Sequence, residues 1–428
     1  MQIINNPNKV SWKDVLKRPT QTVDDIEDTV NQIFDEVSQK GDEAIKKYTS
    51  YFDGISMKSN IVSIGEINDA VKQVPEKLQN AIKIAKKNIE AFHGIQKSSK
   101  IEIETTLGVQ CWQEKRPIQK VGLYIPGGTA PLFSTVLMLA VPAQIAGCKE
   151  IVLCSPPNKA GKLAPEILFA AQLCGVTKII KVGGIQAIAG LTFGTETIPQ
   201  VYKIFGPGNQ FVTVAKQLAT KHGVAIDMPA GPSELLVVAD ETANASYIAS
   251  DLLSQAEHGT DSQVILVSTS KRIIDEVSEE VEKQLDVLPR KAIAEKAMAN
   301  SKLIYVENDD IALELINEYG PEHFIICAKN ENLYVDGINN AGSIFIGDYT
   351  PESAGDYASG TNHTLPTNGF SKAYSGVNLD SFLKSMTFQK ISKDGLLNIG
   401  ETIELMADAE GLQAHKNAVT IRLKDLKK

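Results

Sequence analysis

The sequence predicts an α/β fold in which parallel strands are covered by helices and arranged in at least two units. Three observations indicate this class. From residue 120 to residue 346, short apolar runs typical of buried strands alternate with segments of helical periodicity. Most of these runs lead into a Gly- or Pro-rich turn. The chain has 428 residues with 43% hydrophobic content, which is enough for two or more cores at roughly 100 to 200 residues each.

Helices without catalytic residues are expected before the first strand. Between residues 22 and 51 apolar side chains recur at helical spacing, with Thr22 suited to the N-cap and Gly41 to the stop. A second helix is expected over residues 75–92. The apolar positions of the first pattern are Val23, Ile26, Val30, Ile33, Phe34 and Val37.

The first α/β unit begins at residue 120. Residues 120–126 predict a buried strand, Gly127-Gly128 a turn, 131–146 a helix and 150–154 the next strand, which together form a β-α-β unit. The alternation then continues with a helix over 163–173, a strand over 178–182, a turn and helix over 183–191, and a strand over 200–205.

A second α/β unit begins after a Pro-rich turn at residues 229–232. The expected elements are strands over 223–228, 235–239 and 262–268, a helix over 243–256, and further strands over 303–306, 324–327 and 343–346. Residues 347–376 are rich in Gly, Asp, Ser, Thr and Asn, and a loop this long is usually functional. The tail predicts a helix over 402–409 and a short strand over 419–423.

Composition excludes several classes of function. A formal net charge of -9 argues against a broad nucleic-acid-binding surface. The polar first 20 residues lack a secretory signal, and the apolar run 132–147 is too short for a membrane span, so we expect a cytoplasmic protein with a buried helix there. The five cysteines form no C-x-x-C pair and fit reduced thiols.

Histidines beside carboxylates are the main chemical signal. Imidazole and carboxylate together supply metal ligands or a proton shuttle, although a single pair is more often a solvated helix face. Four of the six histidines have such neighbours, whereas His93 and His222 do not. The four groups are Glu257-His258, Glu322-His323, Asp356 with His363, and Glu410 with His415.

Two of these groups predict specific chemistry. Gln255 and His258 are three residues apart at the end of a predicted helix, so both can reach one metal ion if other regions complete the set. The alternative is a plain helix C-terminus. Glu322-His323 precedes a predicted strand, where the pair suits proton transfer. An exposed turn without a role is the alternative for that pair.

Phosphate-binding motifs give little information. The chain contains no G-x-G-x-x-G and no G-x-x-x-x-G-K-[ST]. Glycines follow three predicted strands, at Gly127-Gly128, Gly183-Gly184 and 206–209. They predict a small-molecule site at a sheet edge, because glycine lets a ligand approach the backbone N–H groups.

Several longer segments resemble the histidinol dehydrogenase family. The most specific are residues 226–234 (IDMPAGPSE) and 251–259 (DLLSQAEHG). Further matching segments are 124–128 (YIPGG), 205–209 (FGPGN), 320–323 (GPEH), 353–363 (SAGDYASGTNH) and 410–417 (EGLQAHKN). The similarity covers essentially the whole chain, in order.

The resemblance implies an architecture as well as an activity. It implies two incomplete Rossmann-like parallel-sheet domains with helices on both faces, and a cytoplasmic homodimer with shared active sites. The implied boundaries are an N-terminal extension over 1–23, a zinc and catalytic domain over 24–125 and 234–375, an inserted NAD domain over 126–233, and a C-terminal segment over 376–428 that reaches the partner.

The implied reaction is the oxidation of L-histidinol to L-histidine through histidinaldehyde, with two NAD per turnover and one zinc ion per subunit. The resemblance makes Glu322 and His323 the acid–base pair. It implies zinc ligands at Gln255, His258, Asp356 and His415, with Glu410 and His415 donated by the partner. Substrate contacts would come from Ser233, Gln255, His258, His323, Asp356, His363, Glu410 and His415, and NAD contacts from Tyr124, Gln186 and Asn209.

Three other readings of the sequence are distinguishable by experiment. A zinc hydrolase with Glu322 as base would turn over without NAD. An aldehyde dehydrogenase with Cys111 as nucleophile would lose activity on Cys111→Ser. A small-molecule binding protein would catalyse nothing, and it leaves the paired histidines unexplained.

Overall fold

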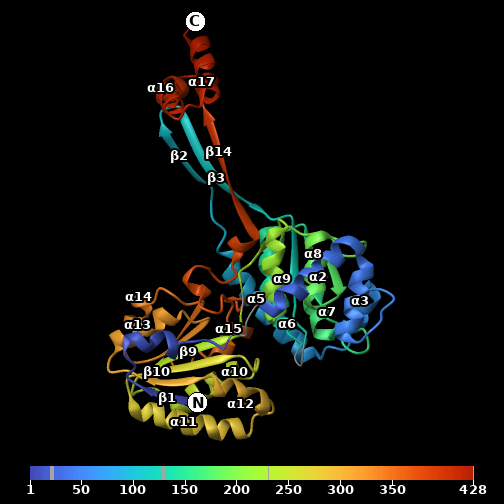
Figure 1. Ribbon diagram of the computed structural model, residues 1–428, viewed down its shortest axis with the longest axis vertical. Helices are drawn as coiled ribbons and strands as arrows, with labels where there is room; N and C mark the ends of the chain where they lie inside the picture. The colour runs from blue at the N-terminus through green and yellow to red at the C-terminus, as the bar shows by residue number, and fades with distance from the viewer. Residues whose placement is uncertain (20–23, 128–130, 230, 428) are drawn as a thin grey trace.

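The computed structural model contains two parallel sheets with their covering helices and a long arm that projects from them (Figure 1). It describes residues 1–19, 24–127, 131–229 and 231–427. The predicted α/β class is therefore confirmed, while the expected N-cap Thr22 and the turn residue Gly128 lie outside the described residues. No helix in the described part is both long and apolar enough to cross a membrane.

One domain is built on a five-stranded parallel sheet of order β6-β5-β4-β7-β8. Its strands are β4 (Lys120–Tyr124), β5 (Glu150–Ser155), β6 (Lys178–Lys181), β7 (Lys203–Phe205) and β8 (Ala225–Ile226). The connecting helices are α6 (Phe133–Ala146), α7 (Pro165–Leu173), α8 (Gly184–Phe193) and α9 (Gln210–Lys221). Apolar side chains on both faces of these strands are buried, as a sheet covered on both sides requires.

The helices before the first strand of this sheet cover the same domain. They are α2 (Asp24–Lys40), α3 (Asp42–Asp53), α4 (Ile64–Val71) and α5 (Glu76–Gly94). Helix α2 packs on α8 and α9, α4 on α7, and α5 on α6. The boundaries implied by the resemblance, which group residues 24–125 with 234–375, stay a prediction, although these four helices pack on helices of the five-stranded sheet.

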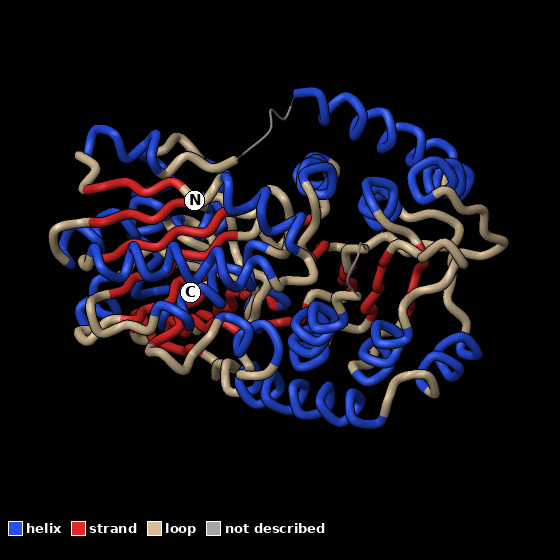
Figure 2. The backbone as a smooth tube through the Cα atoms, turned by 90° about the horizontal axis from the view of Figure 1, so that it is seen from below, coloured by secondary structure: helices blue, strands red, loops and turns tan. Residues whose placement is uncertain are grey.

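The second domain contains a six-stranded parallel sheet of order β1-β11-β10-β9-β12-β13. Its strands are β1 (Gln2–Asn5), β9 (Glu234–Ala239), β10 (Gln263–Ser268), β11 (Lys302–Tyr305), β12 (His323–Cys327) and β13 (Ser343–Ile346). Its helices are α10 (Ala245–Ala256), α11 (Lys271–Asp286), α12 (Lys291–Ala299), α13 (Asp309–Tyr319), α14 (Glu331–Gly337) and α15 (Glu352–Tyr357). Figure 2 shows the two sheets side by side, each between helices. The N-terminal segment, expected as an extension, adds the edge strand β1 and a short helix α1 (Trp12–Val15).

The arm consists of an antiparallel sheet of order β14-β3-β2 with two helices at its tip (Figure 1). The strands are β2 (Ile101–Thr106), β3 (Val109–Pro117) and β14 (Leu383–Ile391), and the helices are α16 (Lys393–Ala409) and α17 (Gln413–Leu426). The strand predicted at 419–423 is wrong, because these residues belong to α17. Val419, Ile421 and Leu423 alternate with other residues in the way typical of a strand. In the structure Leu423 instead packs on Gly400 of α16, as part of a helix pair.

Candidate functional site

A buried cluster of polar side chains lies where strands β9 and β12 begin. Glu322 precedes β12 and His323 is its first residue, so the pair is buried and the exposed-turn reading is wrong. Gln255 is in the last turn of α10, which follows β9 and returns to the edge at which that strand starts. Asp356 is on α15, inside the stretch expected to be a functional loop. The fold therefore joins side chains from three separate segments.

His323 is the centre of this cluster. Its Nδ1 donates to the backbone carbonyl of Glu234 (3.2 Å) and lies 3.2 Å from Nε2 of Gln255. Its Nε2 faces Oδ1 of Asp356 at 3.7 Å and has no hydrogen-bond partner among the residues described. Because Nδ1 keeps its proton for the carbonyl, Nε2 is the position that can exchange a proton with a ligand.

Glu322 is a buried carboxylate that is oriented by a backbone donor. Its Oε2 accepts from the backbone N–H of Glu234 at 2.8 Å and lies 3.6 Å from Nδ1 of His323. Only 7% of the residue is exposed. A carboxylate that is oriented by a backbone donor beside an imidazole is suited to remove a proton from water.

Neighbouring charges determine the protonation of this cluster. Burial alone would lower the pKa of His323, but Glu352, Glu322 and Asp356 raise it well above its ordinary value. Burial acts to raise the pKa of Asp356, yet His323, His363 and His258 together lower it. Burial raises the pKa of Glu352 well above its usual range. At neutral pH the cluster therefore combines an ionised Asp356 with a protonated neighbour.

His363 connects the cluster to the other domain. Its Nδ1 donates to the backbone carbonyl of Asp356 at 3.0 Å, and its Nε2 lies 3.2 Å from Oγ1 of Thr135 on α6. Burial lowers the pKa of His363 despite the opposing charge of Asp356. A neutral imidazole thus connects the two domains. Thr135 follows Pro131 by four residues, and Pro131 lines the pocket described below.

The donor set of the cluster fits a metal ion. His323, Glu352 and Asp356 offer ligand atoms that lie within 4.8 Å of one another. Several buried atoms here also have no hydrogen-bond partner in the described chain, namely Oε1 of Gln255, Nε2 of His323 and both carboxylate oxygens of Glu352. Buried polar atoms are normally paired, so this concentration of unpaired polar atoms indicates a ligand-binding site.

The predicted zinc ligands divide into two groups. Gln255 and Asp356 are in the cluster, and exposed His258 follows α10 near enough for its charge to act on Asp356. His415 and Glu410 are on the arm, at the start of α17 and just after α16, and both are exposed. Figure 1 shows these two helices at the far tip of the arm, away from α10 and α15. The described chain does not bring His415 to its own cluster.

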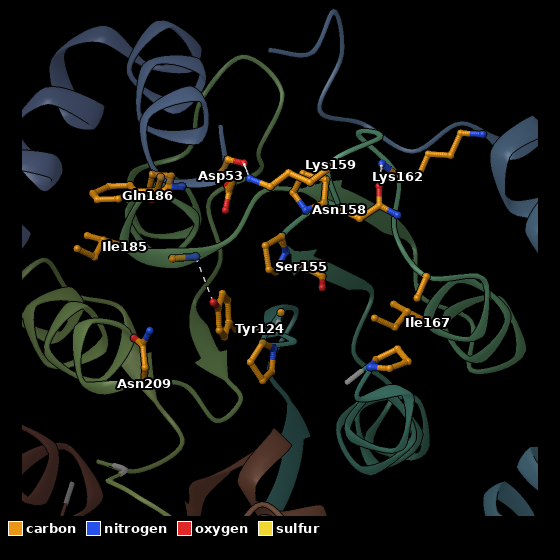
Figure 3. A pocket seen from close by; sticks show the side chains of 18 of the residues that line it. Asp53, Tyr124, Ser155, Asn158, Lys159, Lys162, Ile167, Ile185, Gln186 and Asn209 are labelled. Atoms are coloured by element: carbon orange, nitrogen blue, oxygen red, sulfur yellow. Dashed lines mark hydrogen bonds between the residues drawn. The ribbon is translucent and has the colours of Figure 1, made fainter. Parts of the chain in front are cut away.

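The predicted NAD residues line one pocket of about 760 Å³ at the carboxyl edge of the five-stranded sheet. Figure 3 shows Tyr124, Gln186 and Asn209 on its wall. Tyr124 ends β4, Gln186 is in the first turn of α8, and Asn209 caps α9 by accepting from the N–H of Val212. The carboxyl edge is the usual position of a nucleotide in a parallel sheet.

Two structural features shape this pocket. The Tyr124 hydroxyl accepts from the N–H of Gly184 at 3.1 Å, and burial raises the pKa of Tyr124 to about 12, so the hydroxyl stays neutral. Gly206 has φ +126°, and a Cβ there would lie 2.0 Å from the carbonyl oxygen of Tyr124. Glycine is thus required where the chain leaves β7 toward Asn209.

Several site residues carried no signal in the sequence reasoning. Glu352 is one helical turn before Asp356, a spacing that could have indicated it. Asp53 lines the pocket at the end of α3 and has a buried Oδ2 without a partner in the described chain.

Two further residues were named from the sequence. Ser233, a predicted substrate contact, directly precedes β9 at the same edge as the cluster. Cys111 lies on β3 of the arm, so it is not placed to act as a nucleophile at the pocket.

Comparisons with known proteins agree with one another on one family. The histidinol dehydrogenase family model matches residues 16–423. A histidinol dehydrogenase of Bacteroides fragilis (strain ATCC 25285) is 57% identical over the whole of both chains, and that of Escherichia coli K12 is 53% identical over 97% of this chain and 95% of its own. A crystal structure of histidinol dehydrogenase from Elizabethkingia anophelis covers 100% of this chain and 99% of its own, at 54% identity and a TM-score of 0.98.

Proposed function

The chain belongs to the histidinol dehydrogenase family, and from this premise we propose that it oxidises L-histidinol to L-histidine through histidinaldehyde, using two NAD and a bound zinc ion. Membership makes the protein an NAD-dependent oxidoreductase of histidine biosynthesis. The buried cluster supports the finer proposal, because it combines a proton carrier, a carboxylate base and free metal-binding atoms at one edge of a sheet.

Gln255, His258 and Asp356 would hold the zinc ion, together with His415 of the partner subunit. Of the three residues whose ligand atoms lie within 4.8 Å of one another, only Asp356 belongs to this set, because His323 carries the proton in the proposal. The unpaired Oε1 of Gln255 and the lowered pKa of Asp356 support this set, since both present free oxygen acceptors to a cation. When bound, zinc would supply a Lewis acid and a template for the nitrogen atoms of the substrate.

A homodimer that exchanges arms would complete each site. The support is that Glu410 and His415 lie at the tip of an arm remote from the cluster of their own chain. The arm helices also expose large apolar side chains, including Leu405 at 64% and Met406 at 62%. Exposed apolar surface on a projecting element is typical of an interface between subunits.

The chain's own groups perform the proton transfers in this proposal. His323, in its neutral form, accepts the hydroxyl proton of histidinol at Nε2 while hydride leaves for NAD held by Tyr124, Gln186 and Asn209. Glu322 then removes a proton from the water that attacks the aldehyde, and the hydrate gives up the second hydride to a second NAD as its hydroxyl group loses a proton. Ser233 and His363 contact the substrate, and the closed site keeps the aldehyde from escaping.

The observation that carries the proposal is the unpaired Gln255 Oε1 beside the Glu322 and His323 pair. The test is stoichiometry: purified protein should form two NADH per L-histidinol and contain about one zinc per subunit. Gln255→Ala should lower zinc affinity at least about tenfold in competition with a chromophoric chelator, whereas Ser250→Ala on the same helix should not. Turnover of a hydrolysable ester or amide without NAD would favour the hydrolase instead.

A further inference from the structure

An ion pair between Arg18 and Glu234 is buried beside the cluster. Nε of Arg18 lies 2.6 Å from Oε1 of Glu234 and Nη2 lies 2.9 Å from Oε2, so the contact is bidentate. The two side chains are only 16% and 2% exposed. Arg18 also lies over the ring of Tyr319 at 3.9 Å and donates to its carbonyl oxygen at 2.9 Å. Four contacts therefore fix the guanidinium of a residue in the N-terminal segment.

The backbone of Glu234 contacts the residues that carry the chemistry. Its N–H donates to Oε2 of Glu322 at 2.8 Å. Its carbonyl oxygen accepts from Nε2 of Gln255 and from Nδ1 of His323, both at 3.2 Å. One residue thus orients the carboxylate base, the proton carrier and a zinc ligand through its two peptide groups.

The side chain of Glu234 has a second anchor on the functional loop. Its Oε1 accepts from the backbone N–H of Asn368 at 2.7 Å. Asn368 has φ 55°, a left-handed conformation that is uncommon for a non-glycine residue, and it follows His363 by five residues. The carboxylate therefore connects the N-terminal segment, the start of β9 and the loop that carries His363.

We propose that Arg18 and Glu234 are positioning residues for Glu322 and His323. The guanidinium group of Arg18 fixes both carboxylate oxygens of Glu234. The fixed side chain in turn keeps the peptide N–H and carbonyl of Glu234 within hydrogen-bond distance of Glu322, Gln255 and His323. Removing Arg18 leaves a buried carboxylate without its cation, so the start of β9 shifts to give it water or another donor. The base and the imidazole then lose their alignment with the substrate. This inference rests on the proposed function.

The test compares Arg18→Met, Arg18→Lys and Glu234→Gln with Lys9→Met at saturating zinc. Lys9 forms an exposed ion pair with Glu314 in the same N-terminal segment, so it controls for loss of a cation there. Arg18→Met should lower kcat on the order of 10- to 100-fold, with KM for NAD within about threefold of wild type. Arg18→Lys should recover part of the rate, since lysine keeps the charge without the fork.

Chemical rescue separates positioning from general destabilisation. In Arg18→Ala, guanidinium at non-denaturing concentration should restore kcat saturably, whereas ammonium should restore less. An unchanged kcat in Arg18→Met and Glu234→Gln overturns the inference. A decrease in kcat that is accompanied by an equally large change in KM for NAD, or that guanidinium does not rescue, also overturns it. If Arg18→Met does not fold, the kcat values of Glu234→Gln and Arg18→Lys test the inference in its place. No NADH from histidinol in wild type would instead overturn the proposed function.

Discussion

Asp251 illustrates how a single buried side chain couples the stability of this protein to pH. It lies on α10, one turn before Gln255, and burial raises its pKa from 3.8 to about 7. Between about pH 4 and pH 7, Asp251 is therefore protonated in the folded protein and ionised in the unfolded chain. Across that window the free energy of unfolding falls as the pH rises, and above it the folded state contains a buried charge.

Asp251→Asn should remove this dependence. Near pH 4 the variant should match wild type, because both side chains are neutral in the folded state. Near pH 8 it should be more stable, by at most about 4 kcal/mol, which is three pKa units at about 1.4 kcal/mol each. Urea unfolding at the two pH values measures the difference. Asp275→Asn, an exposed site on α11, is the control, and equal gains at both pH values would contradict the explanation.

Residues with a local signal in the sequence are the ones whose proximity could be predicted. Paired Glu322-His323 and the spacing of Gln255 and His258 pointed to a site, and the structure brings Gln255, Glu322 and His323 together. Sequence reasoning failed for Arg18 and Glu234, whose contact joins residues 216 positions apart in the chain. No periodicity records such a pairing, because an ion pair between distant segments depends on tertiary packing.

At the scale of elements, the arm depends on close contact between its sheet and its helices. Gly395 in the first turn of α16 packs on the turn between β2 and β3, and a Cβ at Gly395 would lie 2.2 Å from the carbonyl oxygen of Gly108. No flexible side chain is available to move there, since the contact is with backbone. The orientation of α16 and α17 on the sheet is therefore fixed by a glycine.

Gly395→Ala should displace α16 and weaken the arm without disturbing the two sheets. Because the arm carries Glu410 and His415, activity and zinc retention should fall together, and on the proposed arrangement the dimer should dissociate at higher protein concentration. Size-exclusion chromatography over a dilution series measures the last effect. Gly94→Ala is the control, because a Cβ added there would have no described heavy atom from outside its own stretch of helix within 4 Å. Full activity in Gly395→Ala would show that the arm tolerates the shift.

The elements of the two sheets were largely predictable and those of the arm were not. Strands β4, β5, β9 and β12 are buried apolar runs, which are the strongest strand signal. Strands β2 and β14 are mostly exposed, so their polar sequences lack that signal. The helix α17 was mistaken for a strand for a related reason, since only Leu423 is buried along its length.

At the scale of the whole molecule, the proposed site belongs to two chains. His258→Ala and His415→Ala should each be inactive alone. Mixed after partial denaturation and refolding, they should recover about a quarter of wild-type activity, because about half of random dimers are hybrids and each hybrid has one intact site. Activity after mixing is the measurement. Failure of the mixture to recover, while refolded wild type does, would place all zinc ligands in one chain.

The cluster and the pocket lie at opposite edges of their sheets, so different ends of the covering helices face the two proposed ligands. The cluster adjoins the C-terminal end of α10, where the unpaired carbonyls of a helix carry partial negative charge. The pocket adjoins the N-terminal ends of α8 and α9, where unpaired N–H groups carry partial positive charge. In the proposed function, the dipoles of these three helices therefore act in the direction that the ligands need, toward a cation beside α10 and toward the phosphates of a dinucleotide beside α8 and α9.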